Sequence, residues 1–295
     1  MYLDMKNGKV RHKFGKDAVY RFLNMTCVNW IRFTTLLASR IISTFFVPAM
    51  SGNGRDSSMI IDGSTFSRDR SKMVELLARV YEHAHKVYLK GFRMLTLGWS
   101  DGVSFLPLNA VLLSSENKKN RYREAKEMDR RSAGYRRRAL SIMKGTEVML
   151  ELLKAAKAAK IPAKDVLFDS WFASPRTIVA VKGIGYDVTA MIKKLPTFLF
   201  GCQGEALTLM EIYKRNKKRR GRSRYLLSVL VEVKSGKECV PAKVVYVRNR
   251  NKRKEYLCLI STDVSLPEEE IIQRYGRRWK IEVFFKVCKS YSQHS

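Results

Sequence analysis

The chain has 295 residues, of which 45% are hydrophobic, so it can bury one large core, or one core and a smaller module. This composition excludes a disordered chain. Lys and Arg number 57 against 27 Asp and Glu, a formal net charge of +30, which is far more than solubility requires. The charge predicts salt-dependent binding to a polyanion, for which nucleic acid is the leading candidate.

The sequence shows no sign of a membrane or disulfide-bonded protein. The five cysteines are scattered with no Cys-x-x-Cys pair, which favours reduced core thiols over a zinc site or disulfides. The N-terminus does not read as a signal peptide. The apolar stretch 41–50 is shorter than the roughly 20 residues that a membrane span needs, and it contains Pro48. We therefore expect a cytoplasmic protein.

Residues 1–56 are expected to form a basic, helical region that binds DNA. The segments 16–23 and 30–42 each show the apolar spacing of a helix, with Arg on the other face. The stretch 51–58 is rich in Gly, Ser and Asn and predicts a loop, so we place the first domain boundary there.

Residues 57–195 are expected to form an α/β core. Strand-like segments lie at 59–62, 92–97 and 105–113, and the stretch between the second and the third predicts a Gly-bearing turn. A helix rich in Ala, Leu and Lys at 146–160 ends before Pro162, and the strand 166–169 follows. Three strands, a helix and a strand are the element order of a ribonuclease-H-like core.

The last third of the chain changes character. Residues 196–262 are expected to form a mostly β insertion, because the strands 225–233, 242–247 and 255–261 are joined by basic turns. Residues 263–295 are expected to add a final core helix, with Ser265 as N-cap and Glu residues suited to the positive end of the helix dipole.

Three carboxylates stand where the local pattern requires an apolar side chain. Asp62 ends the apolar run 59–61, Asp169 ends the run 166–168, and Glu282 has bulky apolar neighbours. Two-metal phosphoryl chemistry needs about three carboxylates from separate elements, with cations about 4 Å apart. Taken singly, each has an ordinary alternative: an Asp after a strand commonly caps a turn, and a lone Glu is commonly exposed. Asp101 competes with Asp62, but its Trp-Ser-Asp-Gly context favours a turn.

Glu282 belongs to a polar stripe on the predicted final helix. At about 100° per residue, Arg278, Glu282 and Lys289 lie roughly 300°, 340° and 320° round from Tyr275, within an arc of about 60°. A carboxylate between two cations and a phenol suits a site that cuts phosphodiesters. The carboxylate would hold a divalent cation, and its neighbours would hold phosphate oxygens.

The spacing Tyr275-x2-Arg278-x3-Glu282-x6-Lys289 resembles the signature of the DDE transposases of bacterial insertion sequences, in the group named after insertion sequence four. The segments 60–64 and 166–171 also resemble this family, and the resemblance extends from about residue 10 to residue 291. It implies a ribonuclease-H-like fold with a β insertion between the second Asp and the Glu. Carried over, Asp62, Asp169 and Glu282 form the metal-binding DDE triad, and Tyr275, Arg278 and Lys289 grip phosphates of the transposon end.

The resemblance also implies a reaction and its partners. Two Mg²⁺ ions, with Mn²⁺ able to substitute, would support hydrolysis at the ends of an insertion sequence and strand transfer into target DNA. The partners would be double-stranded DNA and a second copy, as a homodimer in a synaptic complex on the bacterial nucleoid. Only six residues follow Lys289, whereas family members usually continue through further helices. This leaves two alternatives: a non-catalytic DNA-binding remnant, or a ribonuclease-H-like nuclease without strand transfer.

Other candidate DNA contacts have weaker signals. The segment 214–224 carries eight cations in eleven residues and favours a loop that follows phosphates, with a solvated turn as the alternative. Trp171 could stack on a base near the cut or belong to the core. His83 and His85 would point apart on a predicted helix, so we expect no metal site there. The cations of the loop singled out as DNA contacts are Lys217, Lys218, Arg219, Arg220 and Arg222.

Overall fold

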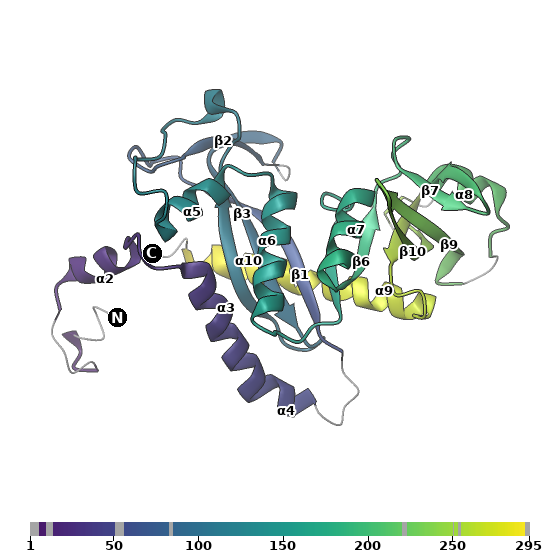
Figure 1. Cartoon of the computed structure of the whole chain (residues 1–295), viewed down its shortest axis with the longest axis horizontal. Helices are drawn as coiled ribbons and strands as arrows, with labels where there is room; N and C mark the ends of the chain where they lie inside the picture. Colours follow the sequence, from purple (N-terminus) through teal and green to yellow (C-terminus); the bar gives the residue numbers. More distant parts are fainter. Residues whose placement is uncertain are drawn as a thin grey trace.

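The computed structural model describes residues 6–9, 14–50, 56–82, 85–219, 223–249, 251–252 and 255–292. Within these residues, eleven strands form one mixed sheet with the order β2-β3-β1-β5-β6-β11-β10-β9-β7-β8, and β4 pairs with β3 (Figure 1). The strands are β1 Ser58–Ser67, β2 Ala78–Glu82, β3 Val87–Ser100, β4 Leu106–Leu113, β5 Asp165–Phe168, β6 Asp187–Ile192, β7 Leu199–Cys202, β8 Glu205–Thr208, β9 Tyr225–Ser235, β10 Glu238–Arg248 and β11 Tyr256–Ser261.

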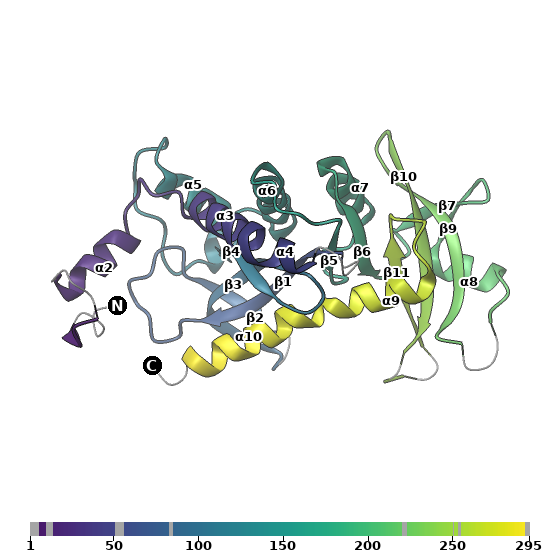
Figure 2. The same cartoon turned by 90° about the horizontal axis from the view of Figure 1, so that it is seen from below.

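Helices cover both faces of the sheet. Figure 2 shows α9 and α10 as one long rod along one face, with α3, α6 and α7 on the opposite side. The helices are α2 Lys16–Leu23, α3 Trp30–Ile41, the π-helical turn η1 Ile42–Phe46, α4 Val47–Met50, the 3-10 turn η2 Lys118–Asn120, α5 Ala133–Ser141, α6 Gly145–Ala158, α7 Pro175–Ile184, α8 Leu209–Arg215, α9 Glu268–Arg277 and α10 Trp279–Ser292.

The centre of the sheet sets the relation between the two predicted aspartates. β1 is antiparallel to β3 and parallel to β5, with Ile60 opposite Leu167. Because side chains alternate along a strand, Ile60 and Leu167 share a face, and the positions two residues further on are Asp62 and Asp169. The two carboxylates therefore lie side by side on neighbouring segments of the sheet.

Two apolar layers explain the continuous apolar run at the start of β1. Met59 and Ile61 pack in the main core beneath α6, whereas Ile60 and Leu167 pack against Ile281 of α10 on the other face. A strand that is buried on both faces does not show the alternation of a half-exposed strand. This is why 59–61 is apolar throughout.

The predicted elements are largely found, with four differences. Asp62 does not end its strand, because β1 continues for five residues and pairs with β3 as far as Ser67. The final helix has Pro267 as its N-cap residue, while the Ser265 hydroxyl bonds Asp263 instead. The helix expected around His85 is wrong, because β2 and β3 flank this position; His83 lies outside the described residues. The insertion strands also continue the core sheet, since β11 pairs with β6.

The N-terminal region contains one long helical run. Together α3, η1 and α4 form 21 helical residues, Trp30–Met50. The most apolar 18-residue stretch of this run has a mean hydropathy of 1.4, and 17% of that stretch is buried. By length and composition this run qualifies as a membrane span, where the sequence predicted none. A single helix of this kind near an N-terminus is weak evidence, and here Thr35, Ala38 and Ile42 are buried in the fold.

Candidate functional site

The rod formed by α9 and α10 carries the polar stripe across β1. Arg278 joins the two helices in a right-handed helical conformation, and the Arg278 and Ile281 N–H groups donate to carbonyls three residues back. The rod is therefore almost continuous, and Tyr275, Arg278 and Glu282 keep the common face that the spacing predicted. Ile281 and Phe285 hold the rod on the sheet by packing against Ile60 and Leu167.

Arg278 joins two of the predicted carboxylates. One terminal nitrogen donates to Asp62 Oδ2 at 2.9 Å, and the other donates to Glu282 Oε1, one turn further along the rod. The side chains of Arg278 and Asp62 are mostly buried, with exposed fractions of 14% and 15%. Residues 216 positions apart in the chain thus form one charged cluster.

Burial raises the pKa of Asp62 from 3.8 to about 6. The Arg278 guanidinium and the Gly63 N–H, which donates to Asp62 Oδ1 at 2.7 Å, oppose this rise. The negative charges of Asp169 and Glu282 reinforce it. All three predicted carboxylates are therefore close enough to interact electrostatically, and the site concentrates negative charge.

Asp169 leads to a second cation, Arg93, which the sequence analysis did not identify. Asp169 Oδ1 accepts the Trp171 N–H at 2.9 Å, and the Arg93 guanidinium lies 4.2 Å from the centre of the Trp171 ring. Burial lowers the pKa of Arg93, while Asp169 and Asp62 raise it. Gly63 leaves room for this side chain, since a Cβ there would lie 3.2 Å from Arg93 Nε. The available signal was a single cation inside the apolar strand 92–97.

Tyr275 and Lys289 border the same cluster. Arg278 lies 5.7 Å from the centre of the Tyr275 ring, and burial raises the pKa of the Tyr275 phenol. Lys289 lines a hollow of about 480 Å³ together with Asp62, Glu282 and Lys286. Two cations and two carboxylates therefore face one open space, which is suited to a phosphate with its counter-ion.

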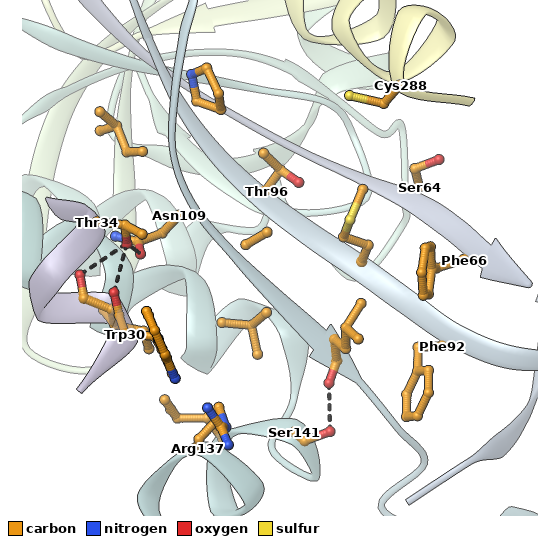
Figure 3. Close-up of a pocket in the computed structure, with 18 of the residues that line it drawn as sticks. Trp30, Thr34, Ser64, Phe66, Phe92, Thr96, Asn109, Arg137, Ser141 and Cys288 are labelled. Carbon is orange, nitrogen blue, oxygen red and sulfur yellow. Dashed lines mark hydrogen bonds between the residues drawn. The ribbon is translucent and has the colours of Figure 1, made fainter. Parts of the chain in front are cut away.

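A larger cavity of about 1240 Å³ lies next to this hollow. Figure 3 shows Trp30, Thr34 and Asn109 on one side of it and Ser64, Phe66 and Cys288 on the other. Phe285 and Lys289 line both spaces. The lining of the larger cavity is mainly apolar, so we assign the chemistry to the smaller hollow, where the charged groups converge.

A second arginine fixes the start of the rod. Arg274 donates to Glu270 at 2.8 Å and to Asp56 at 2.5 Å, and it lies 3.8 Å from Asp165. Its side chain is 5% exposed. The sequence analysis did not single it out, although Ile271, Arg274, Tyr275 and Arg278 follow the i, i+3, i+4, i+7 spacing of a buried helix face.

The donor chemistry of the site suits a divalent cation. Asp62, Asp169 and Glu282 offer carboxylate oxygens, the ligands that Mg²⁺ prefers, and their mutual repulsion favours binding of positive charge. Among the described residues, no three His, Cys, Asp or Glu side chains are grouped closely enough to hold a metal ion. Instead, the Arg278 guanidinium bridges Asp62 and Glu282 and balances part of their charge.

The remaining predicted residues lie elsewhere. Lys217, Lys218 and Arg219 follow α8 and precede β9, which is separated from β1 by four strands, or roughly 24 Å at the usual strand spacing. Arg220 and Arg222 lie outside the described residues.

Trp171 and Asp101 are the last two candidates. Trp171 is 39% exposed beside Arg93. Asp101 caps a turn as predicted, accepting the Val103 and Ser104 N–H groups.

Comparison with known protein families agrees with this chemistry. The model of the family described as DDE superfamily endonuclease matches residues 3–251. The chain belongs to this family. Its membership indicates a nuclease of the transposase type that acts on DNA, in a family that generally uses divalent metals. The matched span includes Asp62 and Asp169 and ends before Glu282. A search of curated proteins found no match.

Proposed function

We propose that this chain is a DNA transposase that cuts the ends of an insertion sequence and joins them to target DNA. Asp62, Asp169 and Glu282 would be the DDE triad of a ribonuclease-H-like core, and they would hold two Mg²⁺ ions, or Mn²⁺ in their place. One cluster carries the proposal: Arg278 bonds both Asp62 and Glu282, and the charges of Glu282 and Asp169 both raise the pKa of Asp62.

The bound cations would activate water and stabilise the attacking and leaving oxygens of the phosphodiester. In this proposal Arg278 binds the DNA end and not the metal ions. It releases Asp62 and Glu282 and turns to a phosphate oxygen of the DNA end, so that it exchanges one anionic partner for another. Lys289 contributes a second cation from the rim of the same hollow. Tyr275, beside Arg278, would hold the DNA end in place.

Arg93 and Trp171 extend the site beyond the carboxylates. The Arg93 guanidinium lies over the Trp171 ring and interacts electrostatically with Asp169 and Asp62. A planar cation on an exposed ring forms a surface on which a nucleotide next to the cut can stack. In this proposal Trp171 positions the DNA end, and the basic segment 217–222 contacts phosphates farther along the duplex.

The remaining features come from the resemblance to the insertion-sequence-four group. We propose that two copies pair two transposon ends as a homodimer, and that the protein works in the cytoplasm on chromosomal DNA. The arrangement β3-β1-β5-β6, with β1 antiparallel to β3 and parallel to β5, supports the ribonuclease-H-like assignment. The shared face of Tyr275, Arg278 and Glu282 along α9 and α10 supports the role of the Tyr-Arg-Glu-Lys spacing.

Cleavage of plasmid DNA that carries the gene's own flanking sequence tests this proposal. The intact chain is compared with Glu282→Gln, and with Glu151→Gln on the exposed surface of α6 as the matched control. We expect Mg²⁺- or Mn²⁺-dependent cuts at the element's ends with the intact chain and the control. Glu282→Gln should lower the rate on the order of 100-fold or more.

The products separate the alternatives. Cuts without joined products would favour a nuclease without strand transfer. Binding without cuts in all three proteins would indicate a non-catalytic DNA-binding protein. Full cleavage by Glu282→Gln would show that the carboxylate assignment is wrong.

A further inference from the structure

The β2–β3 ribbon carries a row of cations and aromatic rings on one face. Arg79 stands opposite Lys90 and Tyr81 opposite Tyr88, so these four side chains share a face. The Arg79 guanidinium lies 4.0 Å from the centre of the Tyr88 ring, and the Tyr81 and Tyr88 rings are 5.1 Å apart. Lys90 Nζ lies 5.2 Å from the Tyr122 ring. We call these five residues the ribbon face.

The ribbon face is exposed. Tyr88 and Tyr122 are 59% and 58% exposed, and Tyr81 is 40% exposed. Cross-strand tyrosines stabilise a ribbon, so their contact alone implies no ligand. The placement of the cations does suggest one: in the described part of the chain Arg79 makes no ion pair with a carboxylate and lies on a ring instead. Of the nearby acids, Glu82 pairs with His85 on the other face, and Asp69 caps the Lys90 N–H.

The ribbon extends the sheet that holds the carboxylates. Gly91 pairs with Ser67 of β1 and Ala78 of β2, and a Cβ there would lie 2.2 Å from the Phe66 carbonyl oxygen. The close approach that glycine permits holds the base of the ribbon against β1. The ribbon therefore continues the plane of the sheet beyond the end of β1 (Figure 1).

Register places the ribbon face on the same side of the sheet as Asp62. Asp62 pairs with Thr96, and the alternate positions of β3 on that side are Met94, Phe92, Lys90 and Tyr88. Along β3, six residues separate Thr96 from Lys90 and eight separate it from Tyr88, which is roughly 20 and 26 Å at the usual strand rise. Both spacings are shorter than one turn of B-form DNA, about 34 Å.

We propose that the ribbon face binds the DNA duplex that flanks the cut. Arg79 and Lys90 would contact phosphates, and Tyr81 and Tyr88 would pack on sugars and base edges, since a two-stranded ribbon fits a groove of the duplex. A duplex held at the carboxylates and lying along this side of the sheet would reach the ribbon within one turn. This inference rests on the proposed function in one respect, namely that the chain acts on DNA.

Binding to a fluorescent 40-base-pair duplex without metal tests the proposal, by anisotropy over a series of salt concentrations. Arg79→Gln with Lys90→Gln should weaken binding about 10-fold at low salt and lower the slope of log K against log salt by about 2. Tyr81→Leu with Tyr88→Leu should weaken binding about 3- to 10-fold and leave the slope unchanged. Lys154→Gln with Lys160→Gln, exposed on the α6 side, is the charge-matched control and should change binding less than about 2-fold.

The outcomes are distinguishable when thermal melting shows that every variant is folded. If the intact chain does not bind DNA, both this inference and the proposed function fail. If it binds and the ribbon variants bind equally well, only the ribbon inference is overturned. If polyglutamate displaces the duplex as effectively as unlabelled DNA, and the tyrosine variant has no effect, the ribbon is a general anion surface and the inference is also overturned.

Discussion

Two arginines one turn apart on the same rod hold carboxylates in different ways. Arg274 and Arg278 each bond a Glu four residues away on the rod and an Asp from the β1 region. The Arg274 side chain is 5% exposed and also lies against buried Asp165. The Arg278 cluster borders an open hollow that Lys289 lines.

This difference separates a structural arginine from a functional one. The Arg274 network joins α9 to Asp56 and to buried Asp165, and none of these residues lines the hollow. The Arg278 partners can exchange it for another cation, because Asp62 and Glu282 both line the hollow. Replacing the two arginines should therefore have different effects on stability and on metal binding, and both effects can be measured.

Replacing Arg274 should have the largest effect on stability. Arg274→Met leaves Asp56, Glu270 and Asp165 without their buried cation, and we expect a loss of about 3 to 5 kcal/mol of unfolding free energy. Urea unfolding at pH 7 measures this loss. Arg215→Met, which breaks an exposed pair with Glu205, is the control and should cost less than about 1 kcal/mol. An equal cost for both would contradict the structural role of Arg274.

Asp62 should make stability depend on pH. Its pKa is raised in the folded protein from 3.8 to about 6, so between these values the folded state binds the proton more tightly. The contribution to unfolding free energy is therefore greatest below pH 3.8 and is lost as pH rises through 6, by at most about 3 kcal/mol.

Asp62→Asn removes this pH dependence. Relative to the intact chain, the variant should gain stability between pH 4 and pH 7, as measured by urea unfolding at each pH. A parallel pair of pH profiles would show that Asp62 titrates normally.

Replacing Arg278 should cost less than replacing Arg274 and should favour metal binding. Arg278→Met frees Asp62 and Glu282, and Asp62 can take up a proton, so we expect a loss of about 1 kcal/mol. If the guanidinium competes with a cation for these carboxylates, Mg²⁺ should bind the variant about 10-fold more tightly, which calorimetry and the Mg²⁺-dependent rise in Tm would detect. Weaker Mg²⁺ binding would contradict exchange at this site.

Glu282 and Glu270, which bond the two arginines, should differ least in their effect on unfolding free energy. Glu282→Gln removes repulsion from Asp62 along with a bond to Arg278, so its unfolding free energy should change by less than about 1 kcal/mol. Glu270→Gln weakens a bond to buried Arg274 and should cost about 1 kcal/mol more. Both measurements use the same urea titration. A larger cost for Glu282→Gln would reverse the distinction between the two clusters.

Predictions that depended on local periodicity were confirmed. The stripe formed by Tyr275, Arg278 and Glu282 follows from 100° per residue, which holds along a single helix whatever it packs against. The strand predicted at 166–169 and the helix predicted at 146–160 correspond to β5 Asp165–Phe168 and α6 Gly145–Ala158, because apolar content and helix propensity act over a few neighbouring residues.

Long-range pairing determined what the sequence did not reveal. Asp62 lies inside β1 because Gly63 and Ser64 pair with β3, although this dipeptide is typical of a turn. The contacts of Arg93 and Arg274 could not be read from local patterns, because their partners Trp171 and Asp56 are distant in the chain. β2 was missed because its burial depends on pairing with β3.

The sequence by itself determined the charge of the protein, the three acids in apolar surroundings and the face of the rod that carries Glu282. Each depends on composition or on a periodicity that is local to one element. Only the tertiary structure brought Asp62 to Arg278, 216 residues away, and placed the Arg278 partners, but not the Arg274 partners, at the hollow. Burial and partner choice are set by the packing of the rod on the sheet, which no local pattern encodes.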